Sequence, residues 1–385
     1  MKFEYLLNDL TKIRRDLHQI PEIGLEEYQT SEYIKKMLDE MNVKYEQVAG
    51  TGILAKLKGD TSDNPICFRA DMDGLPVKED NTVDYKSNNG MMHACGHDGH
   101  MTMLIGLIKV LAKKNLKRDV LFLFQPGEEN VGGAEKVLQD KNFQKHKIES
   151  IYGCHLDPSI EEGKIGINSG PLMAQDILFD IYINGKASHG AEPHKGIDAI
   201  YVASQIVSLY QSILSRNVEP VESGIITIGK IDGGNFRNQV AENVKLEGIV
   251  RTFKDEIYEK IRGRISQINK GIEESFDVKV KEDFYNYCPS VINDENLYNV
   301  FIKDFPKEKI FKVKPQMIAE DFGFYRSQIP SLFFLLGAKN DSKGFNISLH
   351  NSNFNFDEKI LLNGVEAFYH IVEANNIIKE GVFYD

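Results

Sequence analysis

The hydrophobic pattern of this chain of 385 residues changes its character twice, and this double change restricts the possible folds more than any other feature. In the first 160 residues, short apolar runs such as Ile66 to Ala70 and Val120 to Phe124 alternate with helical stretches such as Met101 to Leu111. Strands that are apolar throughout are typical of a parallel sheet covered on both faces. We therefore predict an α/β fold with an open, mostly parallel sheet.

The middle of the chain has a different pattern. Apolar residues recur at every second position from Ile177 to Ile183, which predicts a half-exposed strand. The predicted elements of this region follow the order β-α-β-β-α-β, which is the split unit of ferredoxin-like folds. We therefore predict an inserted ferredoxin-like domain at residues 174–284. Buried strands and helices then return, so the sheet domain is predicted to comprise residues 1–173 and 285–385.

Composition excludes several classes of function. Lys and Arg number 46 against 57 Asp and Glu, and the net charge of −11 argues against non-specific nucleic-acid binding. The longest apolar run, Leu332 to Leu336, is far shorter than the roughly 18 residues of a membrane span. The four scattered cysteines do not form a disulfide framework, and no signal-peptide pattern is found. We therefore expect a cytoplasmic protein without nucleic-acid or membrane partners.

Polar residues follow each predicted strand of the first part. Asp71 and Asp73 follow the strand that ends at Ala70, Glu128 and Glu129 follow the strand that ends at Phe124, and His155 follows a strand over residues 151–154. In an open parallel sheet, ligands bind beyond the carboxyl ends of the strands. We therefore expect these side chains to meet at one edge.

The run from His93 to His100 contains three histidines, one cysteine and one aspartate in eight residues. Thiolate, imidazole and carboxylate are the ligands that zinc and similar ions prefer, so the density favours a metal site over a packing cysteine among surface histidines. Glu128 and Glu129 suit a metal ligand beside a general base, although acidic residues are also common at helix N-termini. Asp71 and Asp73 are compatible with metal binding, with orienting a ligand histidine, or with a turn before Gly74.

Eight segments in order give the chain a recognisable resemblance. It resembles the metal-dependent aminoacylase and carboxypeptidase family of amidohydrolases, in the branch of hippurate hydrolase, the auxin-conjugate hydrolases and N-acetyldiaminopimelate deacetylase. The resemblance covers nearly the whole chain. The segments are RADMDGLP (69–76), MHACGHDGH (92–100), FLFQPGEENVGGAE (122–135), GCHLDP (153–158), ASHGAEPH (187–194), EGIVRTF (247–253), AEDFG (319–323) and SLHNSNFNFDE (348–358).

The resemblance implies two divalent metal ions, which in this family are Zn, Mn, Co or Ni. Glu128 matches the general base of the family, Asp73 matches the aspartate that orients the metal site, and Asp71 is its close neighbour. Two positions depart from the usual pattern of the branch: Gly127 replaces an alanine and Asn130 replaces a glycine. The implied metal ligands are Cys95, His97, Glu129, His155 and His350.

The inserted domain is implied to form a homodimer and to act as a lid. His189 matches a histidine that reaches the active site of a partner subunit and stabilises the oxyanion, whereas a solvent-exposed loop position is its ordinary interpretation. Asn238 and Arg251 lie where the family binds polar groups of the substrate, and an ordinary surface charge is the alternative for Arg251.

The implied reaction is hydrolysis of the amide between an acyl group and an amino acid. Within the branch, residues 121–135 and 215–229 look most similar to N-acetyldiaminopimelate deacetylases of lysine synthesis. Hydrolysis of hippurate or other N-acyl amino acids, cleavage of dipeptides, and metal-dependent binding of an amino-acid conjugate without hydrolysis are the alternatives. Retention of Glu128 argues against the last of these, because a binding protein does not need a general base.

Overall fold

The computed structural model describes residues 2–129 and 132–379, and it divides into two compact units. The first unit contains the chain up to Leu172, Val291–Pro315, and the chain from Asp321 onward. The second unit contains Met173–Ser290 and Gln316–Glu320. Asn130, which departs from the pattern of the branch, lies outside the described residues.

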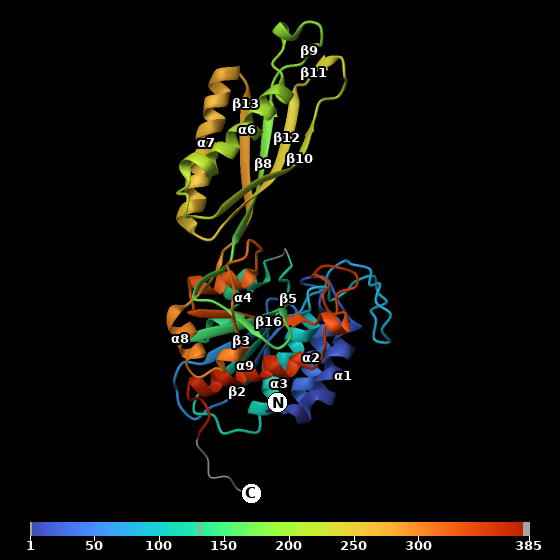
Figure 1. Cartoon of the computed structure of the whole chain (residues 1–385), viewed down its shortest axis with the longest axis vertical. Coiled ribbons are helices and arrows are strands. Elements are labelled where there is room, and N and C mark those ends of the chain that lie inside the picture. Colours follow the sequence, from blue (N-terminus) through green and yellow to red (C-terminus); the bar gives the residue numbers. More distant parts are fainter. Residues whose placement is uncertain (1, 130–131, 380–385) are drawn as a thin grey trace. The chain divides into compact units, whose positions relative to one another are not determined.

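The first unit is built on a sheet of eight strands in the order β1-β2-β4-β3-β5-β16-β6-β15 (Figure 1). Strands β4, β3, β5 and β16 are parallel neighbours, which confirms the predicted α/β fold with a large, mostly parallel sheet. The strands of this unit are β1 (Lys44–Val48), β2 (Gly52–Leu57), β3 (Ile66–Asp71), β4 (Val120–Gln125), β5 (Ser150–Glu161), β6 (Ile165–Ile167), β7 (Gly170–Met173), β14 (Val291–Asn293), β15 (Ile310–Lys312) and β16 (Ser331–Lys339).

Helices cover this sheet, and three of them form the main core beside it. Helices α1, α3 and α9 pack on one another, while α3 also contacts β3 and α9 also contacts β16. The α-helices of the unit are α1 (Leu7–His18), α2 (Tyr28–Glu40), α3 (His97–Leu111), α4 (Gly133–Gln139), α5 (Lys141–Gln144), α8 (Glu295–Lys303) and α9 (Ile360–Ala374). Its short 3-10 helices are η1 (Glu4–Leu6), η3 (Lys307–Lys309), η4 (Asp321–Ser327) and η5 (Asp341–Lys343).

Strand β5 is longer than its apolar run predicts. We expected a strand that stops before His155, but β5 continues to Glu161, so His155 lies inside the strand. The reason is its neighbour: β16 pairs with β5 from Ile151 through Asp157 and keeps the backbone extended. His155 is therefore held by sheet hydrogen bonds on a rigid element.

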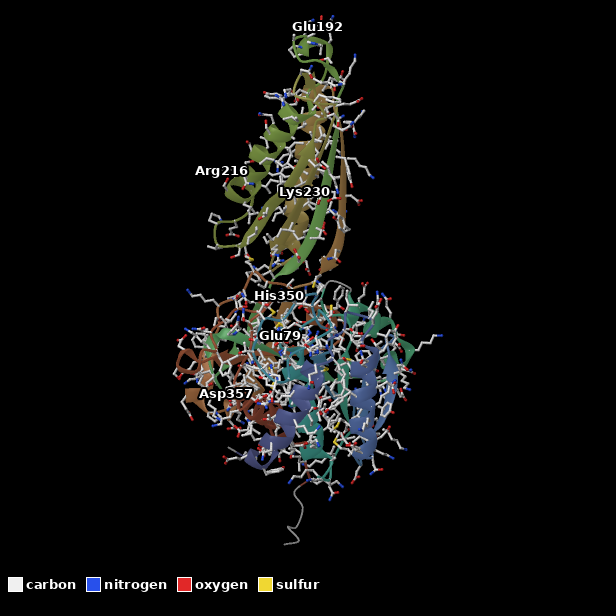
Figure 2. All side chains as sticks on the ribbon, turned by 90° about the vertical axis from the view of Figure 1, so that its right-hand side faces the viewer. Glu79, Glu192, Arg216, Lys230, His350 and Asp357 are labelled. Atoms are coloured by element: carbon white, nitrogen blue, oxygen red, sulfur yellow. The ribbon has the colours of Figure 1, made fainter. Side chains whose placement is uncertain are left out.

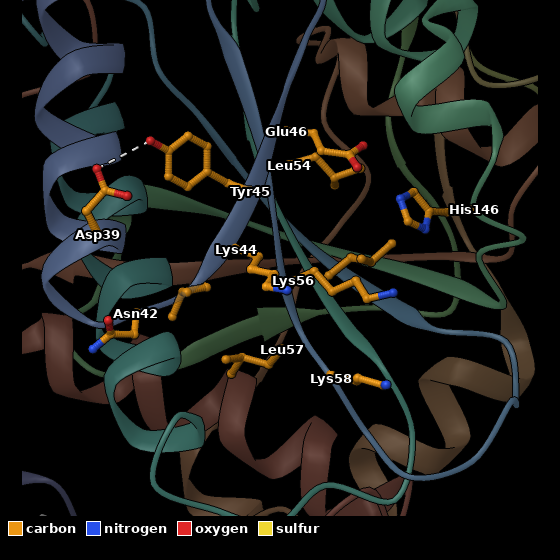
Figure 3. A pocket seen from close by; sticks show the side chains of 12 residues that line it. Asp39, Asn42, Lys44, Tyr45, Glu46, Leu54, Lys56, Leu57, Lys58 and His146 are labelled. Atoms are coloured by element: carbon orange, nitrogen blue, oxygen red, sulfur yellow. Dashed lines mark hydrogen bonds between the residues drawn. The ribbon is translucent and has the colours of Figure 1, made fainter.

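A groove of about 1030 Å³ lies at the β1–β2 edge of the sheet (Figure 3). Lys44 of β1 lies directly opposite Lys56 of β2, and the ammonium group of Lys56 pairs with Asp119 at 2.6 Å. Lysines on an edge strand oppose pairing with the strand of another molecule, because the charge would have to be desolvated. We interpret this cluster of lysines as protection of the exposed edge of β1.

The second unit is a sheet of four antiparallel strands in the order β10-β12-β8-β13, with a buried core between it and two helices. Its main elements follow the chain order β8-α6-β10-β12-α7-β13. Strand β13 runs to Cys288, past the end predicted at residue 284. The elements are β8 (Gln175–Asn184), β9 (Ser188–His189), η2 (Pro193–Lys195), α6 (Ala199–Asn217), β10 (Gly224–Gly233), β11 (Gln239–Val240), β12 (Asn243–Thr252), α7 (Asp255–Phe276) and β13 (Lys279–Cys288). In the described part of the chain, no helix combines the length and hydropathy that a membrane crossing requires.

The same substitution at two helical glycines is expected to change stability in opposite directions. A Cβ atom at Gly106 of α3 would lie 2.7 Å from Cγ2 of Val365, so Gly106→Ala is expected to lower the free energy of unfolding by about 1–3 kcal/mol. Gly263 of α7 has open space around it, so Gly263→Ala is expected to raise that free energy by about 0.5–1 kcal/mol. Urea denaturation followed by circular dichroism measures both changes, and equal effects of the two would contradict the packing of α3 on α9.

Candidate metal centre

The first turn of α3 brings two of the predicted ligands to the edge of the sheet. Cys95 and His97 flank Gly96, which has a φ of +87° and precedes the helix. A Cβ atom at Gly96 would lie 2.8 Å from Cδ1 of Leu156, so glycine is required by both its backbone conformation and its surroundings. The tight turn lets a thiol and an imidazole from neighbouring positions face the same space.

All five predicted ligands meet in the first unit. The Sγ atom of Cys95 lies 3.3 Å from Nε2 of His155 and 3.3 Å from Nε2 of His350. Nε2 of His350 lies 3.3 Å from Oε1 of Glu129. The donor atoms of Cys95, His97 and His155 lie within 4.8 Å of one another. The fold therefore brings Cys95 and His350, which are far apart in sequence, into direct contact.

Backbone carbonyl groups fix the orientation of two of the histidines. Nδ1 of His97 lies 2.8 Å from the carbonyl oxygen of Asp73, and Nδ1 of His155 lies 2.7 Å from that of Leu156. A carbonyl oxygen only accepts hydrogen bonds, so each Nδ1 carries the proton. In the neutral ring, Nε2 then presents a lone pair to the space beside Cys95. Both imidazoles are thus oriented as ligands.

Asp73 also holds Glu129. Its Oδ2 atom accepts a hydrogen bond of 2.9 Å from the backbone N–H of Glu129, while its carbonyl group holds His97. Glu128 and Glu129 precede α4, and the donor atoms of His97, Glu128 and Glu129 also lie within 4.8 Å of one another. Asp73, in the turn after β3, is therefore hydrogen-bonded both to His97 of α3 and to Glu129.

Asp71 and His100 form a second, adjacent layer. Oδ1 of Asp71 lies 2.6 Å from Nδ1 of His100, and Oδ2 accepts a hydrogen bond of 2.7 Å from Nη1 of Arg69. The N–H of Leu156 donates to Nε2 of His100 at 2.9 Å, so this ring nitrogen is already occupied. Burial lowers the pKa of His100 to about 4, although Asp71 opposes the shift. His100 was counted in the metal-binding run from the sequence, but both of its ring nitrogens are occupied by Asp71 and Leu156. Arg69 was not predicted to take part, and its place within the segment RADMDGLP was the available signal.

The carboxylates around Cys95 and His97 favour a cation at the centre. Burial raises the pKa of the Cys95 thiol well above its usual value, and the carboxylates of Glu129 and Glu128 raise it further. Burial alone would lower the pKa of His97, but Asp71 and Asp73 raise it to about 10. Within residues 2–129 and 132–379, the buried Nε2 of His97 forms no hydrogen bond, and the buried Oε1 of Glu129 has only the ion-pair contact of 3.3 Å with Nε2 of His350. A positive ion at this point would satisfy both atoms and stabilise the thiolate.

The three remaining predicted residues belong to the second unit. His189 is exposed in β9, which pairs with β11, and the carbonyl group of Asn238 accepts a hydrogen bond of 2.8 Å from Gly190. Arg251 of β12 pairs with Asp176, with 3.1 Å between Nη2 and Oδ2, and donates to the carbonyl oxygen of Met317 at 2.5 Å. The metal centre lies wholly in the first unit, where Figure 2 shows the half-exposed His350.

A parallel α/β sheet with sulfur, nitrogen and oxygen donors at its carboxyl edge is typical of metal-dependent hydrolases. The model of peptidase family M20/M25/M40 matches residues 67–374, and the chain belongs to this family. It is 35% identical over 376 residues to the N-acetyldiaminopimelate deacetylase of Listeria welshimeri, covering 96% of this chain and 100% of that protein. The enzyme of the same name from Anoxybacillus flavithermus is 36% identical over 376 residues, covering 96% of this chain and 98% of that protein.

Solved structures are similar over the whole chain. A putative aminohydrolase from methicillin-resistant Staphylococcus aureus has a TM-score of 0.90 and 30% identity, covering 97% of both chains. A Bacillus subtilis protein described as a dinuclear metal-binding peptidase of the M20 family has a TM-score of 0.84 and 30% identity, covering 97% of this chain and 99% of that chain. The resemblance predicted from the sequence motifs is confirmed.

The electrostatic origin of the shift at His97 can be tested in metal-free protein. Asp71→Asn removes the largest contribution that raises the pKa of His97, so we expect this pKa to fall from about 10 toward its ordinary value of 6.5. Histidine resonances followed by NMR across pH measure the change. His146 lies outside the centre and serves as the internal control, and an unchanged His97 titration would contradict the charge balance described here.

Proposed function

We propose that this chain is a dinuclear-metal amidohydrolase that removes the acyl group of N-acyl amino acids, with N-acetyldiaminopimelate as the preferred substrate. The convergence of Cys95 with His155 and His350 carries the proposal, because two histidines far apart in sequence place metal-ligating atoms within 3.3 Å of the same thiol. The curated relatives named N-acetyldiaminopimelate deacetylase, similar over nearly their full length, support the choice of substrate.

The donors present fit two divalent cations. Cys95, His97 and His155 form one group of donor atoms, and Cys95, Glu129 and His350 form another. The thiolate and imidazole donors suit Zn or another borderline ion better than Mg, and the family resemblance adds Mn, Co and Ni as alternatives. When bound, such cations lower the pKa of water toward neutrality and polarise a carbonyl group. The buried Nε2 of His97, which forms no hydrogen bond with the described residues, supports this assignment.

Glu128 is proposed as the general base. A carboxylate oxygen of Glu128 lies within 4.8 Å of a ring nitrogen of His97 and a carboxylate oxygen of Glu129, which places it beside the proposed metal ligands. In the proposed reaction Glu128 accepts a proton from the attacking water and then delivers it to the leaving amine. Asp73 keeps Glu129 and His97 in place during both steps through the hydrogen bonds described above.

The second unit is proposed to be a ferredoxin-like dimerisation and lid domain. The strand order β10-β12-β8-β13 and the chain order β-α-β-β-α-β support this assignment. We propose that His189 stabilises the oxyanion and that Asn238 and Arg251 bind polar groups of the substrate. Because Arg251 pairs with Asp176, a substrate carboxylate would have to compete with that ion pair.

Replacing the general base separates metal binding from turnover. Glu128→Gln is expected to retain the metal content of the wild type and to reduce kcat for N-acetyldiaminopimelate by about 10²–10⁴-fold, the usual contribution of a general base. Metal analysis and deacetylation kinetics on the same preparation measure both. Lys136→Gln, an exposed change in α4, is the control. Wild-type turnover in Glu128→Gln would assign the base to another residue.

A substrate panel tests the specificity. We expect the highest kcat/KM for N-acetyldiaminopimelate, lower values for hippurate and other N-acyl amino acids, and the lowest values for dipeptides. The metal-reconstituted enzyme is assayed with each compound at equal Zn, Mn or Co content. Preference for hippurate or for dipeptides would overturn the proposed substrate, and binding without hydrolysis of any compound would overturn the proposed activity.

Mixing two inactive variants tests the proposed role of His189. If this histidine serves the active site of another subunit, then His189→Ala and Glu128→Gln proteins mixed and allowed to exchange subunits are expected to recover activity. Each variant alone, treated in the same way, is the control. Absence of recovery in mixed dimers verified by mass spectrometry would show that His189 does not act between subunits.

A further inference from the structure

A buried arginine of α1 connects two segments that are distant in sequence. Arg14 is only 1% exposed, and its guanidinium group contacts both segments at once. Nε donates to Oδ2 of Asp98 at 2.7 Å, and Nη2 donates to Oδ1 of Asn355 at 3.0 Å. These contacts lie in the first unit, on the side of α3 that carries no candidate ligand.

The first of these segments contains Cys95 and His97. Asp98 follows His97 in the first turn of α3 and is fully buried. Besides Arg14, Oδ2 of Asp98 lies 2.8 Å from Nδ1 of His18, whose other nitrogen lies 3.1 Å from Oε1 of Glu79. The helix turn is thus held by Asp73 on the side of the metal centre and by α1 on the other side.

The second segment contains His350. His350 has a φ of +63°, a left-handed conformation that a residue with a side chain adopts only when its surroundings impose it. Its N–H donates to the carbonyl oxygen of Ala94 at 2.9 Å, which places it beside Cys95. Five residues further on, Asn355 is held by Arg14. Between them, the carbonyl groups of Ser352 and Phe354 accept hydrogen bonds from Asp80 and Asn81, so Arg14 fixes the far end of a segment that is tied down along its length.

The shape of the guanidinium group matters for this connection. Arg14 lies over the ring of Phe356 at 4.5 Å and near the ring of Tyr85 at 4.9 Å, measured to the ring centres. A planar group between two rings directs its N–H bonds toward Asp98 and Asn355 at the same time. A lysine retains the charge but can reproduce neither the stacking nor the two divergent hydrogen bonds.

We infer that Arg14 is a positioning residue of the metal centre, which sets the separation between the Cys95 thiol and the His350 imidazole by holding Asp98 and Asn355. The inference rests on the proposed function, because it assumes that Cys95 and His350 bind a common cation. It adds a residue on α1 that touches neither the donor atoms nor the substrate. Such supporting contacts typically change metal affinity by about 10–100-fold.

The test is a double-substitution cycle on metal binding. Dissociation constants for Zn²⁺ are measured by chelator competition on metal-free, full-length wild type, Arg14→Lys, His350→Ala and the double variant. We expect Arg14→Lys to weaken the binding of one cation by about 10–100-fold in the wild type. In the His350→Ala background the same change is expected to have no further effect, since the separation from His350 no longer matters. If Arg14→Lys only lowered the stability of the fold, it would weaken Zn²⁺ binding equally in the wild type and in His350→Ala.

Two further variants complete the design. Asn355→Ala leaves the contact of Arg14 with Asp98 in place and removes the contact with Asn355, together with the hydrogen bonds of Asn355 to Tyr85 and Phe356. It is expected to show the same dependence on His350, even if Arg14→Lys fails to fold. Arg118→Lys is the control, because it removes a guanidinium pair with Glu149 at the amino end of the sheet and is expected to leave Zn²⁺ binding unchanged.

The outcomes separate the inference from the proposed function. Zn²⁺ affinity unchanged in both Arg14→Lys and Asn355→Ala, or reduced equally with and without His350, would overturn the role of Arg14 while leaving the metal centre intact. A wild type that binds no divalent cation would overturn the proposed function itself.

Discussion

The burial of the Cys95 thiol among carboxylates and imidazoles is the constraint on which the rest of the centre depends. A thiolate next to Glu129 and Glu128 is unfavourable in a dry site, and burial raises the pKa of the thiol accordingly. Without a cation the thiol therefore stays protonated, whereas a positive charge at this point would stabilise the thiolate. Nε2 of His97 forms no hydrogen bond with the described residues, and it therefore marks a place where a cation would bind. The orientation of these residues is already fixed without a metal, because Asp73 forms hydrogen bonds with both His97 and Glu129.

The parallel sheet supplies the rigidity that such a centre needs. Asp71 ends β3, Gln125 ends β4, and His155 lies within β5, so three neighbouring strands deliver residues to one edge. Helix α3 adds Cys95 and His97 through the turn at Gly96. Side chains on strands and on the first turn of a buried helix move little, and metal ligands must be held to within a fraction of an ångström. Cys95, Glu129 and His350 come from turns and loops, and His350 lies farthest along the chain from any helix or strand, so its segment depends on additional contacts.

The sequence predicted the parallel sheet, the βαββαβ order of the middle region and the edge where the polar residues meet, because buried strands and polar strand ends leave local patterns. It could not predict His350 from local pattern, since an isolated histidine in a loop carries no periodicity; only the family resemblance indicated it. The length of β5 was underestimated because pairing with β16, a long-range contact, extends it. The arrangement of Arg14, Asp98 and Asn355 was also not predicted. Asp98 was counted in the metal-binding run from His93 to His100, whereas the structure pairs it with Arg14 of α1, a long-range contact that leaves no local pattern.

The proposed metal ligands and the residues proposed to contact the substrate belong to different units. The proposed cation ligands, from Cys95 to His350, all belong to the first unit. The residues proposed to contact the substrate, His189 and Arg251, belong to the second unit. Under the proposed assignment, substitutions in the second unit would alter the choice of substrate without loss of the metals. The two units have separate hydrophobic cores, so residues that contact the substrate can change without disturbing the packing around the metal ligands. In this way one metal centre would serve amides of different acyl groups and amino acids.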